Sequence, residues 1–198
     1  MKSMLRKFEF KGKTFVVFPK VYYPADDSFL LAENLEIDKQ NKVLDLGTGC
    51  GLLAIIAADT AQHVIAIDIN PLAIKNTKYN ANLNKTKVET LLGNLFDPIK
   101  GKFDLIIFNP PYLPSEMNSN DIEEKSWNGG MNGRLILDQF LKEVDNFLES
   151  DGKIQFVQSS LANIDQTLEK LKSLNFIPKI IARKKFFYEK LVVIKAWK

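Results

Sequence analysis

Hydrophobic and polar positions form two kinds of stretch along this chain: short apolar runs, and longer stretches in which apolar residues recur with helical spacing. Short, almost continuous apolar runs are typical of strands buried on both faces of a sheet. Seven such strands are expected, at 43–46, 63–69, 88–92, 103–109, 152–158, 176–187 and 190–197. Helices are expected between them, at 52–59, 71–82, 134–149 and 164–174. This alternation predicts an α/β fold with a seven-stranded, mostly parallel sheet and helices on both faces.

The first 35 residues follow a different pattern. Residues 8–18 predict a β-hairpin with Gly12 in its turn. Asp26, Asp27 and Ser28 stand just before the apolar residues 29–35, as the capping residues of a helix do. Because no repeat, low-complexity tract or linker interrupts the chain, we expect a single domain over residues 1–198. It would consist of an N-terminal extension, 1–35, and a Rossmann-like core, 36–198.

The composition narrows the class of protein. The 198 residues are 45% hydrophobic and 26% charged, as in a soluble globular protein. Cys50 and His63 are the only residues of their types, so no intramolecular disulfide, no usual zinc site and no histidine-based nucleophilic mechanism is expected. No signal-peptide pattern occurs at the N-terminus, and no apolar run reaches the roughly 18 residues that span a bilayer. We therefore expect a cytoplasmic protein without a metal site or a membrane segment.

The net charge of +3 is unevenly distributed. Residues 1–20 carry +5 and residues 179–198 carry +6, whereas the 158 residues between them carry −8. Basic ends could contact RNA or an acidic partner. Lysines on the solvent faces and exposed edges of strands explain the same pattern, and we favour this second interpretation.

The apolar strand 103–109 stops at Asn109-Pro110-Pro111-Tyr112. Proline has no backbone N–H, so the sheet ladder cannot continue, and Asn109 is left at the carboxyl edge of the sheet, where ligands bind in open α/β folds. Each proline also favours extended geometry in the residue before it, which stiffens the turn. An amide, a stiff turn and an aromatic ring suit the binding of a planar group. A simple strand-ending turn is the alternative.

A glycine-rich loop, Asp45-Leu46-Gly47-Thr48-Gly49-Cys50-Gly51, joins the first core strand to a helix. Its glycines let a ligand approach the backbone closely. Gly51 stands one residue too early for a dinucleotide-binding loop, and the acidic Asp45 favours an ammonium group over a phosphate. Asp68, at the end of the second strand, suits the hydroxyls of a ribose, and Asn94, after the third, suits the edge of a base. The loop and these side chains predict a site for an adenosine that carries an amino acid.

This ordered series resembles the class I S-adenosylmethionine-dependent methyltransferases. The resemblance implies that S-adenosylmethionine is the cofactor, with Asp45 at its amino acid end and Asp68 at its ribose. Over the whole chain it implies cofactor contacts from Ser28, Asp45, Gly47, Thr48, Gly49, Gly51, Asp68, Ile69, Asn94, Leu95 and Asn109.

Within that group, Asn-Pro-Pro-Tyr resembles the motif of enzymes that methylate a nitrogen next to a π-system: adenine N6, cytosine N4 or a glutamine side-chain amide. Such a nitrogen is a poor nucleophile because its lone pair is delocalised. The Asn109 side-chain oxygen and the Pro110 carbonyl can each accept one of its hydrogens and hold it in line with the methyl group. Tyr112 can stack on the planar group. Asn109, Pro110 and Tyr112 are the expected catalytic residues, and Pro111 completes the expected acceptor site.

Two further stretches are similar to the HemK-type protein glutamine methyltransferases, and most of all to their short archaeal and eukaryotic branch. One is residues 21–31, Val-Tyr-Tyr-Pro-Ala-Asp-Asp-Ser-Phe-Leu-Leu, and the other is residues 127–134, Trp-Asn-Gly-Gly-Met-Asn-Gly-Arg. The resemblance implies methylation of the glutamine in the Gly-Gly-Gln motif of a class I release factor. It also implies, for eukaryotic members, a small zinc-binding activator subunit. Asn94 and Tyr23 depart from the family pattern, which more often has acids there.

Two rival functions remain open. An adenine N6 methyltransferase acting on RNA or DNA would have a nearly identical site, but duplex DNA requires base flipping and a basic surface. The segment 112–133 instead carries four acids, Glu116, Asp121, Glu123 and Glu124, against one base, Lys125. Nucleic acid is therefore the less favoured acceptor. The second rival is a binding module without activity, which the complete set of site residues disfavours.

Overall fold

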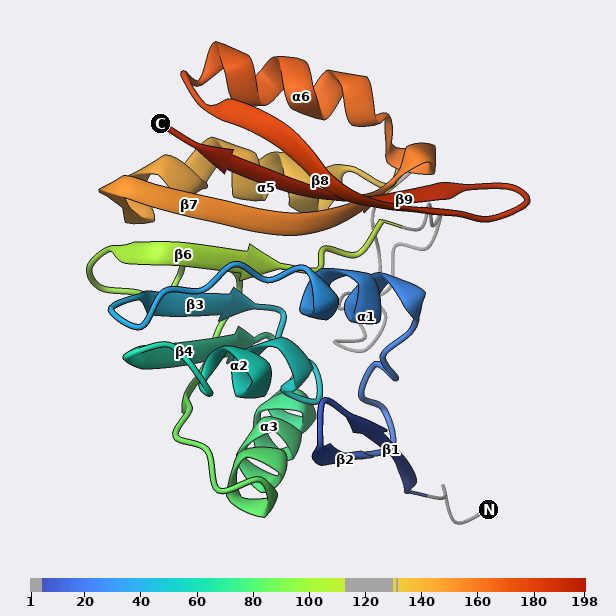
Figure 1. Ribbon diagram of the computed structural model, residues 1–198, viewed down its shortest axis with the longest axis vertical. Helices are drawn as coiled ribbons and strands as arrows, with labels where there is room; N and C mark the ends of the chain where they lie inside the picture. Colours follow the sequence, from blue (N-terminus) through green and yellow to red (C-terminus); the bar gives the residue numbers. More distant parts are fainter. Residues whose placement is uncertain (1–4, 113–129, 131) are drawn as a thin grey trace.

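The computed structural model describes residues 5–112, 130 and 132–198, which form a hairpin and a larger sheet with helices packed on it (Figure 1). The hairpin consists of β1 (Arg6–Phe10) and β2 (Lys13–Val17). The larger sheet contains β3 (Lys42–Leu46), β4 (His63–Asp68), β5 (Glu89–Leu92), β6 (Phe103–Phe108), β7 (Leu148–Ser159), β8 (Ile177–Lys185) and β9 (Lys190–Trp197). The helices are α1 (Asp26–Glu33), α2 (Leu52–Ala57), α3 (Pro71–Leu83), α5 (Leu135–Glu143) and α6 (Ile164–Ser173), with short 3-10 turns η1 (Val144–Phe147) and η2 (Ser160–Ala162).

The seven strands of the larger sheet lie in the order β5-β4-β3-β6-β7-β9-β8. All neighbouring pairs from β5 to β7 are parallel, and β9 runs antiparallel to both β7 and β8. The predicted seven-stranded, mostly parallel sheet with an N-terminal hairpin is therefore confirmed.

Each face of the sheet carries its own apolar core. Helices α1, α2 and α3 pack on one face and α5 and α6 on the other, and Figure 1 shows α1 and α2 in front of the sheet with α5 behind it. The alternation of β6 shows the division, because Leu105 and Ile107 join the first core while Ile106 and Phe108 join the second. By the same alternation, Asn109 comes next on the face that α1 covers.

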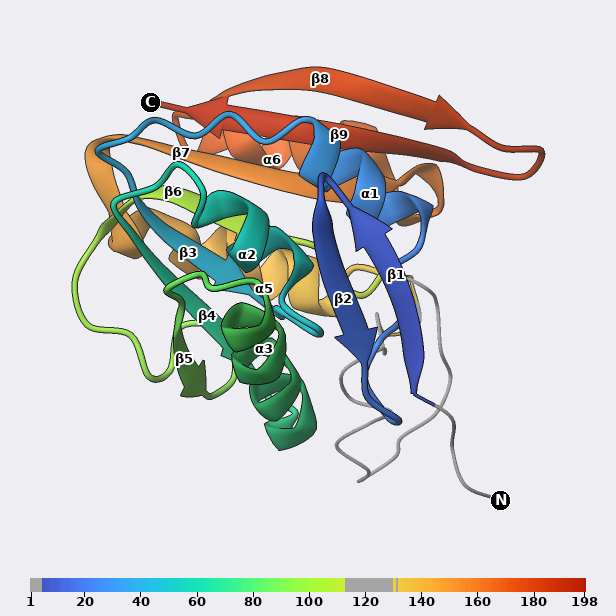
Figure 2. The ribbon, with the colours of Figure 1, turned by 60° about the horizontal axis from the view of Figure 1, so that its bottom comes forward.

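The hairpin is attached to the core through asparagines on α3, and Figure 2 shows the two elements side by side. Asn80 accepts from the Val16 N–H at 3.0 Å and donates to the Val16 carbonyl at 2.8 Å. Asn84 does the same for both backbone groups of Thr14, at 3.1 and 2.8 Å. These side chains satisfy backbone groups that β2 would otherwise leave unpaired. The hairpin, and with it the start of α1, is thereby fixed relative to the glycine-rich loop.

Most element boundaries agree with the prediction to within two residues, and two regions differ by more. Helix α1 begins at Asp26, so the acids lie in its first turn, and the residue before it, Ala25, makes no side-chain capping bond. The helix expected over 134–149 ends at Glu143, and Leu148 already belongs to β7. Val144 and Leu148 are both buried in the core beneath α5, which explains why their spacing looks helical.

Candidate functional site

The candidate site lies where β3 and β6 end side by side, with Leu46 paired to Phe108. From β3 the sheet continues through β4 and β5, and from β6 it continues through β7 in the opposite direction. Such a switch point leaves a crevice beyond the carboxyl ends of the strands, where open α/β sheets bind ligands. Because Gly47 follows β3 and Asn109 follows β6, the glycine-rich loop and the Asn-Pro-Pro-Tyr motif begin at neighbouring positions.

The glycine-rich loop is held against β4 and α3. The Thr48 N–H donates to the Ile67 carbonyl at 2.9 Å, and the Thr77 hydroxyl donates to the Gly49 carbonyl at 3.1 Å. Gly51 precedes α2 with φ +88°, and a Cβ there would lie 2.9 Å from Thr77 Cγ2. Only glycine fits this position, because a side chain would be both strained and too close to α3.

Asp68, the expected ribose ligand, is buried and binds the backbone of the loop. Its Oδ2 accepts from the Gly49 N–H at 2.9 Å and its Oδ1 from the Asn70 N–H at 2.8 Å. Burial raises the pKa of this carboxyl above its usual range. Ile69, between Asp68 and Asn70, is half-buried. In this structure Asp68 therefore ties the loop to the end of β4.

Asp45 is fully buried, and its Oδ2 accepts from the Ala54 N–H in α2 at 3.1 Å. Its Oδ1 forms no hydrogen bond of normal geometry with any described residue, although the nearby Thr48 hydroxyl, which is also without such a partner, partly offsets the effect of burial on the pKa of the carboxyl. Burial raises the pKa of Asp45 to about 7. A buried, unpaired carboxylate oxygen is costly unless a donor or a cation arrives, so Asp45 has the chemistry to hold an ammonium group.

Asn94 and Leu95 follow β5, in a turn that begins beside the end of β4. The Gly93 N–H donates to the Asp68 carbonyl at 3.0 Å, which brings this turn against the end of β4. Leu95 is buried with φ +45°, an unusual backbone conformation for a leucine, and Asn94 is half-buried. The structure thus brings the turn with Asn94 and Leu95 to the edge of the sheet where the glycine-rich loop lies.

Asn109 lies against the first turn of α1. Its Nδ2 donates to Ser28 Oγ at 3.1 Å, while its Oδ1 is shielded from solvent and has no hydrogen-bond partner among the described residues. Pro110 is buried, and Pro111 and Tyr112 are half-buried. The motif therefore holds one buried amide oxygen without a hydrogen bond to any described residue, at the carboxyl edge of the sheet.

Asp27 is a site residue that sequence reasoning treated only as a helix cap. It is 3% exposed, and its Oδ2 accepts from the Tyr112 hydroxyl at 3.2 Å. Both of its oxygens also accept from the Tyr22 hydroxyl at 3.0 Å, and Oδ1 accepts from Ser28 Oγ at 3.0 Å. Burial, followed by the charge of Asp27, raises the pKa of both tyrosines, which keeps them protonated as donors.

Tyr23, which departs from the family pattern, belongs to the packing of the hairpin. Its ring lies 5.7 Å from the ring of Phe8, and the Arg6 guanidinium stacks over it at 4.0 Å. The hydrophobic contacts and the cation–π contact account for an aromatic residue here.

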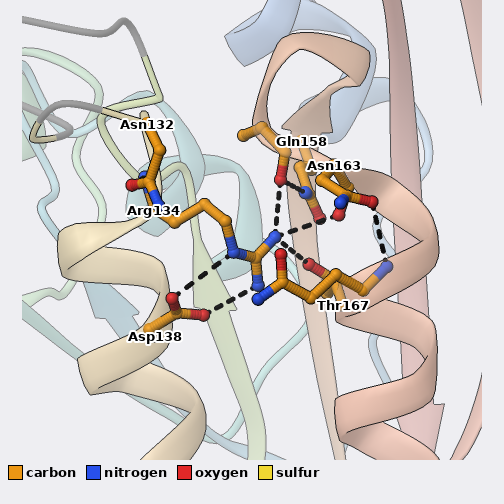
Figure 3. A network of polar contacts seen from close by, with 8 residues as sticks. Asn132, Arg134, Asp138, Gln158, Asn163 and Thr167 are labelled. Atoms are coloured by element: carbon orange, nitrogen blue, oxygen red, sulfur yellow. Dashed lines mark hydrogen bonds and ion pairs between the residues drawn. The ribbon is translucent and has the colours of Figure 1, made fainter.

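A buried arginine anchors the chain just before α5 (Figure 3). Arg134 is 2% exposed, and its guanidinium donates to the Ala162 carbonyl and, at 2.8 Å, to Thr167 Oγ1. It also forms an ion pair with Asp138 at 2.7 Å. Arg134 thus links the start of α5 to the segment between β7 and α6, and its removal would take one donor from the Ala162 and Asn163 carbonyls and from Thr167 Oγ1.

Gly133 packs directly on the end of the Asn-Pro-Pro-Tyr motif. Its φ is +69°, and a Cβ there would lie 2.2 Å from the Tyr112 carbonyl oxygen. The glycine is therefore required for close contact between the Arg134 anchor and Tyr112. The sequence signal was the glycine-rich stretch 127–134, of which residues 127–129 and 131 lie outside the described residues, as does the acidic stretch 113–129.

Comparison with known proteins identifies relatives of this chain. Residues 24–187 match the model of the methyltransferase small domain. A Methanocaldococcus jannaschii protein, provisionally named a protein N5-glutamine methyltransferase, is 42% identical over 193 residues, which cover 96% of this chain and 98% of the relative. A release factor glutamine methyltransferase from Aquifex aeolicus is 31% identical, over 76% of this chain and 59% of the relative.

A solved structure shares the fold. It is the Mtq2–Trm112 complex of E. cuniculi, which is described as responsible for the methylation of the eRF1 translation termination factor. The match has a TM-score of 0.71 at 22% identity and covers 91% of this chain and 99% of that one. In the part of this chain that the structure describes, no helix has the length and apolar character needed to cross a membrane. The relatives confirm the resemblance to the HemK-type enzymes.

Proposed function

The chain belongs to the methyltransferase small domain family, and we propose that it transfers a methyl group from S-adenosylmethionine to the side-chain amide of a glutamine. The acceptor we propose is the glutamine of the Gly-Gly-Gln motif in a class I translation release factor. The names of the two relatives support this assignment. The observation that carries it is the Oδ1 of Asn109 at the end of β6, which is shielded and has no hydrogen-bond partner among the described residues.

The residues of the cofactor half fit S-adenosylmethionine. Asp45 Oδ1 is an unpaired acceptor, and its carboxylate can bind the ammonium group of the cofactor's amino acid portion. Asp68 and Asn94, at the ends of neighbouring strands, would face the ribose and the adenine. When bound, the cofactor supplies an electrophilic methyl group on a sulfonium. The protein residues bind it, exclude water and orient the acceptor.

The acceptor half fits a primary amide. Asn109 Oδ1 would accept one N–H of the glutamine amide, and the Pro110 carbonyl would accept the other. Both bonds strengthen as the nitrogen becomes positive during transfer, so they favour the transition state over the bound substrate. Tyr112 would stack on the flat amide, with its hydroxyl held by Asp27. A strong base is not required, because the methylated nitrogen becomes acidic only after transfer.

A glutamine that follows two flexible glycines suits an acceptor site at the end of β6. Two glycines before the glutamine give a slim chain that can carry one amide down to Asn109. An adenine amino group also presents two hydrogens and a flat face, so the site alone would accept both. The acidic stretch 113–129 favours a basic protein surface over phosphates.

A methyl-transfer assay with three acceptors tests the proposal. Wild-type enzyme and Asn109→Ala receive S-adenosylmethionine with a labelled methyl group, together with a release factor, RNA or DNA. We expect label in the release factor with the wild type, and a large loss of it with the variant. Label in RNA or DNA adenine, with none in the release factor even when a candidate activator subunit is present, would replace this proposal with the nucleic-acid function.

We also propose that the edge of the sheet at β5 binds a small partner subunit. β5 is an outer strand of the sheet, and Leu92 on it is 57% exposed. Unpaired backbone groups and an exposed leucine suit the addition of a strand from another chain. The existence of the Mtq2–Trm112 complex supports a two-protein assembly, and the resemblance to the eukaryotic enzymes suggests a zinc-binding subunit. Full activity that no partner raises would count against this proposal.

A further inference from the structure

We infer that Asp27, acting through Ser28, is a positioning residue that decides which atom of the Asn109 amide faces the acceptor. The inference rests on the proposed function for its effect on turnover. Three groups carry it: a buried carboxylate, a buried hydroxyl 3.0 Å away, and an amide nitrogen 3.1 Å beyond that hydroxyl. Two hydrogen bonds join these groups in a continuous series from the first turn of α1 to the end of β6.

The direction of each hydrogen bond follows from chemistry. The Tyr22 hydroxyl and the Asp27 carboxylate both lie near the Ser28 hydroxyl, and the carboxylate, which can only accept and is the stronger acceptor, takes its single hydrogen. The Ser28 oxygen is then left as an acceptor, and only the NH₂ of the Asn109 amide can donate to it. The amide is therefore turned so that Oδ1 faces away from α1, unpaired.

This orientation matters because the oxygen of an amide accepts hydrogen bonds whereas its NH₂ donates them. The two groups are similar in size, so packing alone would not select one orientation. A half-turn of the Asn109 side chain would present an NH₂ to the NH₂ of the acceptor, and two donors repel. Only the orientation set by Ser28 offers an oxygen to the nitrogen that receives the methyl group. The orientation of the shielded Oδ1 thus results from the series of hydrogen bonds that begins at Asp27.

Asp27 is itself held in place from several sides. The hydroxyls of Tyr22 and Tyr112 and the Ser28 N–H all donate to its carboxylate. Next to it in α1, Phe29 packs against the hairpin ring of Phe8 at 5.6 Å. The carboxylate therefore cannot turn away from Ser28 without giving up several bonds in a buried place.

Paired variants test the inference through turnover. Ser28→Ala removes the hydroxyl, whereas Ser28→Thr keeps it. Asp27→Asn replaces an obligate acceptor by an amide that can also donate. Its matched control is Asp26→Asn, because Asp26 is exposed and pairs only with Lys184 among the described residues. We expect Ser28→Ala and Asp27→Asn to lower kcat about tenfold or more, the value of one hydrogen bond to a charged or reacting group. Asp26→Asn should stay close to the wild type, and Ser28→Thr should recover most of the kcat that Ser28→Ala loses.

A second readout needs no acceptor. In protein labelled with 15N, the side-chain NH₂ signal of Asn109 is identified by its absence from Asn109→Ala. Its exchange with solvent should be slow in the wild type and Ser28→Thr, and at least about tenfold faster in Ser28→Ala and Asp27→Asn, because the bond that protects it is lost. Folding of every variant is checked by thermal melting.

The two readouts separate the two proposals. A wild type that methylates no glutamine overturns the proposed function, while the exchange rates still decide the role of Asp27 and Ser28. Unchanged kcat and unchanged exchange in folded Ser28→Ala and Asp27→Asn would overturn the positioning role. Slower turnover in Ser28→Ala that Ser28→Thr does not restore would overturn it as well.

Discussion

The two halves of the site share one design but build it from different parts. Each half has one buried carboxylate with both oxygens paired, Asp68 on the cofactor side and Asp27 on the acceptor side. Each also has one shielded oxygen that forms no hydrogen bond of normal geometry with the described residues, Asp45 Oδ1 and Asn109 Oδ1 respectively. The paired carboxylates shape the site, and the unpaired oxygens are left to bind ligands.

The difference lies in what pairs the two shaping carboxylates. Asp68 accepts from the backbone N–H groups of Gly49 and Asn70, whereas Asp27 accepts mainly from the hydroxyls of Ser28, Tyr22 and Tyr112. The position of Asp68 in the cofactor half therefore depends on the backbone conformation of the glycine-rich loop. The position of Asp27 in the acceptor half depends on which side chains surround it. Substitutions on the two sides should have separable effects, on cofactor affinity in one case and on turnover in the other.

The largest expected effect is that of Asn109→Ala on turnover. We expect kcat to fall by about a hundredfold or more, because the lost bond acts mainly in the transition state. The cofactor dissociation constant should change by no more than about threefold, since Asp45 and the loop are untouched. Single-turnover rates and calorimetric titration measure the two quantities separately. A parallel loss of both would mean that the halves are not separable.

The next effect is that of Asp68→Ala on cofactor affinity. The carboxylate accepts two backbone bonds and would also bind the ribose, and bonds to a charged group are worth roughly 1.5–3 kcal/mol each, so we expect a loss of tenfold or more. The melting temperature should drop as well, because the Gly49 N–H loses its acceptor, but the protein should remain folded. An unchanged affinity in a folded variant would remove Asp68 from the cofactor site.

Asp45 should make cofactor affinity depend on pH. Its pKa in the free protein is about 7, so its carboxyl is protonated at lower pH and cannot attract the ammonium group. We expect affinity to fall about tenfold between pH 8 and pH 6, because a group titrating near pH 7 is mostly neutral at the lower value. Asp45→Asn should bind weakly with little pH dependence. An equally steep profile in that variant would point to another group.

The ionisation of Asp45 should also make the stability of the free protein depend on pH. Because burial raises the pKa of Asp45 above its unfolded value, the folded state holds a proton that the unfolded state has already lost. The wild type should therefore lose stability relative to Asp45→Asn as the pH rises from about 4 to about 7, and this loss should level off above that range. Melting temperatures of both proteins across this range measure the loss. A wild type that instead gains stability relative to Asp45→Asn as the pH rises would contradict the burial of Asp45.

The smallest expected effect on turnover is that of Gly133→Ala, whose main cost is in stability. Its matched control is Gly12→Ala, because both glycines have a positive φ, of +69° and +73°, but a Cβ at Gly12 meets nothing within 4 Å. Backbone strain of about 1 kcal/mol is common to both variants. Gly133→Ala should lose more melting temperature and some kcat, because its Cβ would push on the Tyr112 carbonyl. Equal losses in the two variants would mean that this contact does not matter.

Much of this arrangement was predictable because it depends on local chemistry. Two prolines end β6 at the right place, glycines mark the loop after β3, and acids stand at the strand ends. The role of Asp27 could not be predicted, because its partner Tyr112 lies 85 residues away and acids in a first turn look like caps. The bonds from Asp68 to the loop were equally hidden, since they depend on how Gly49 folds back.

Tandem mass spectrometry of the acceptor tests the central claim most directly. A release factor is incubated with S-adenosylmethionine and either the wild type or Asn109→Ala, and its Gly-Gly-Gln peptide is sequenced. The arrangement of Asn109 predicts one methyl group on the glutamine side chain with the wild type, and almost none with the variant in the same time. A methyl group on another residue, or equal methylation of the glutamine by both enzymes, would contradict it.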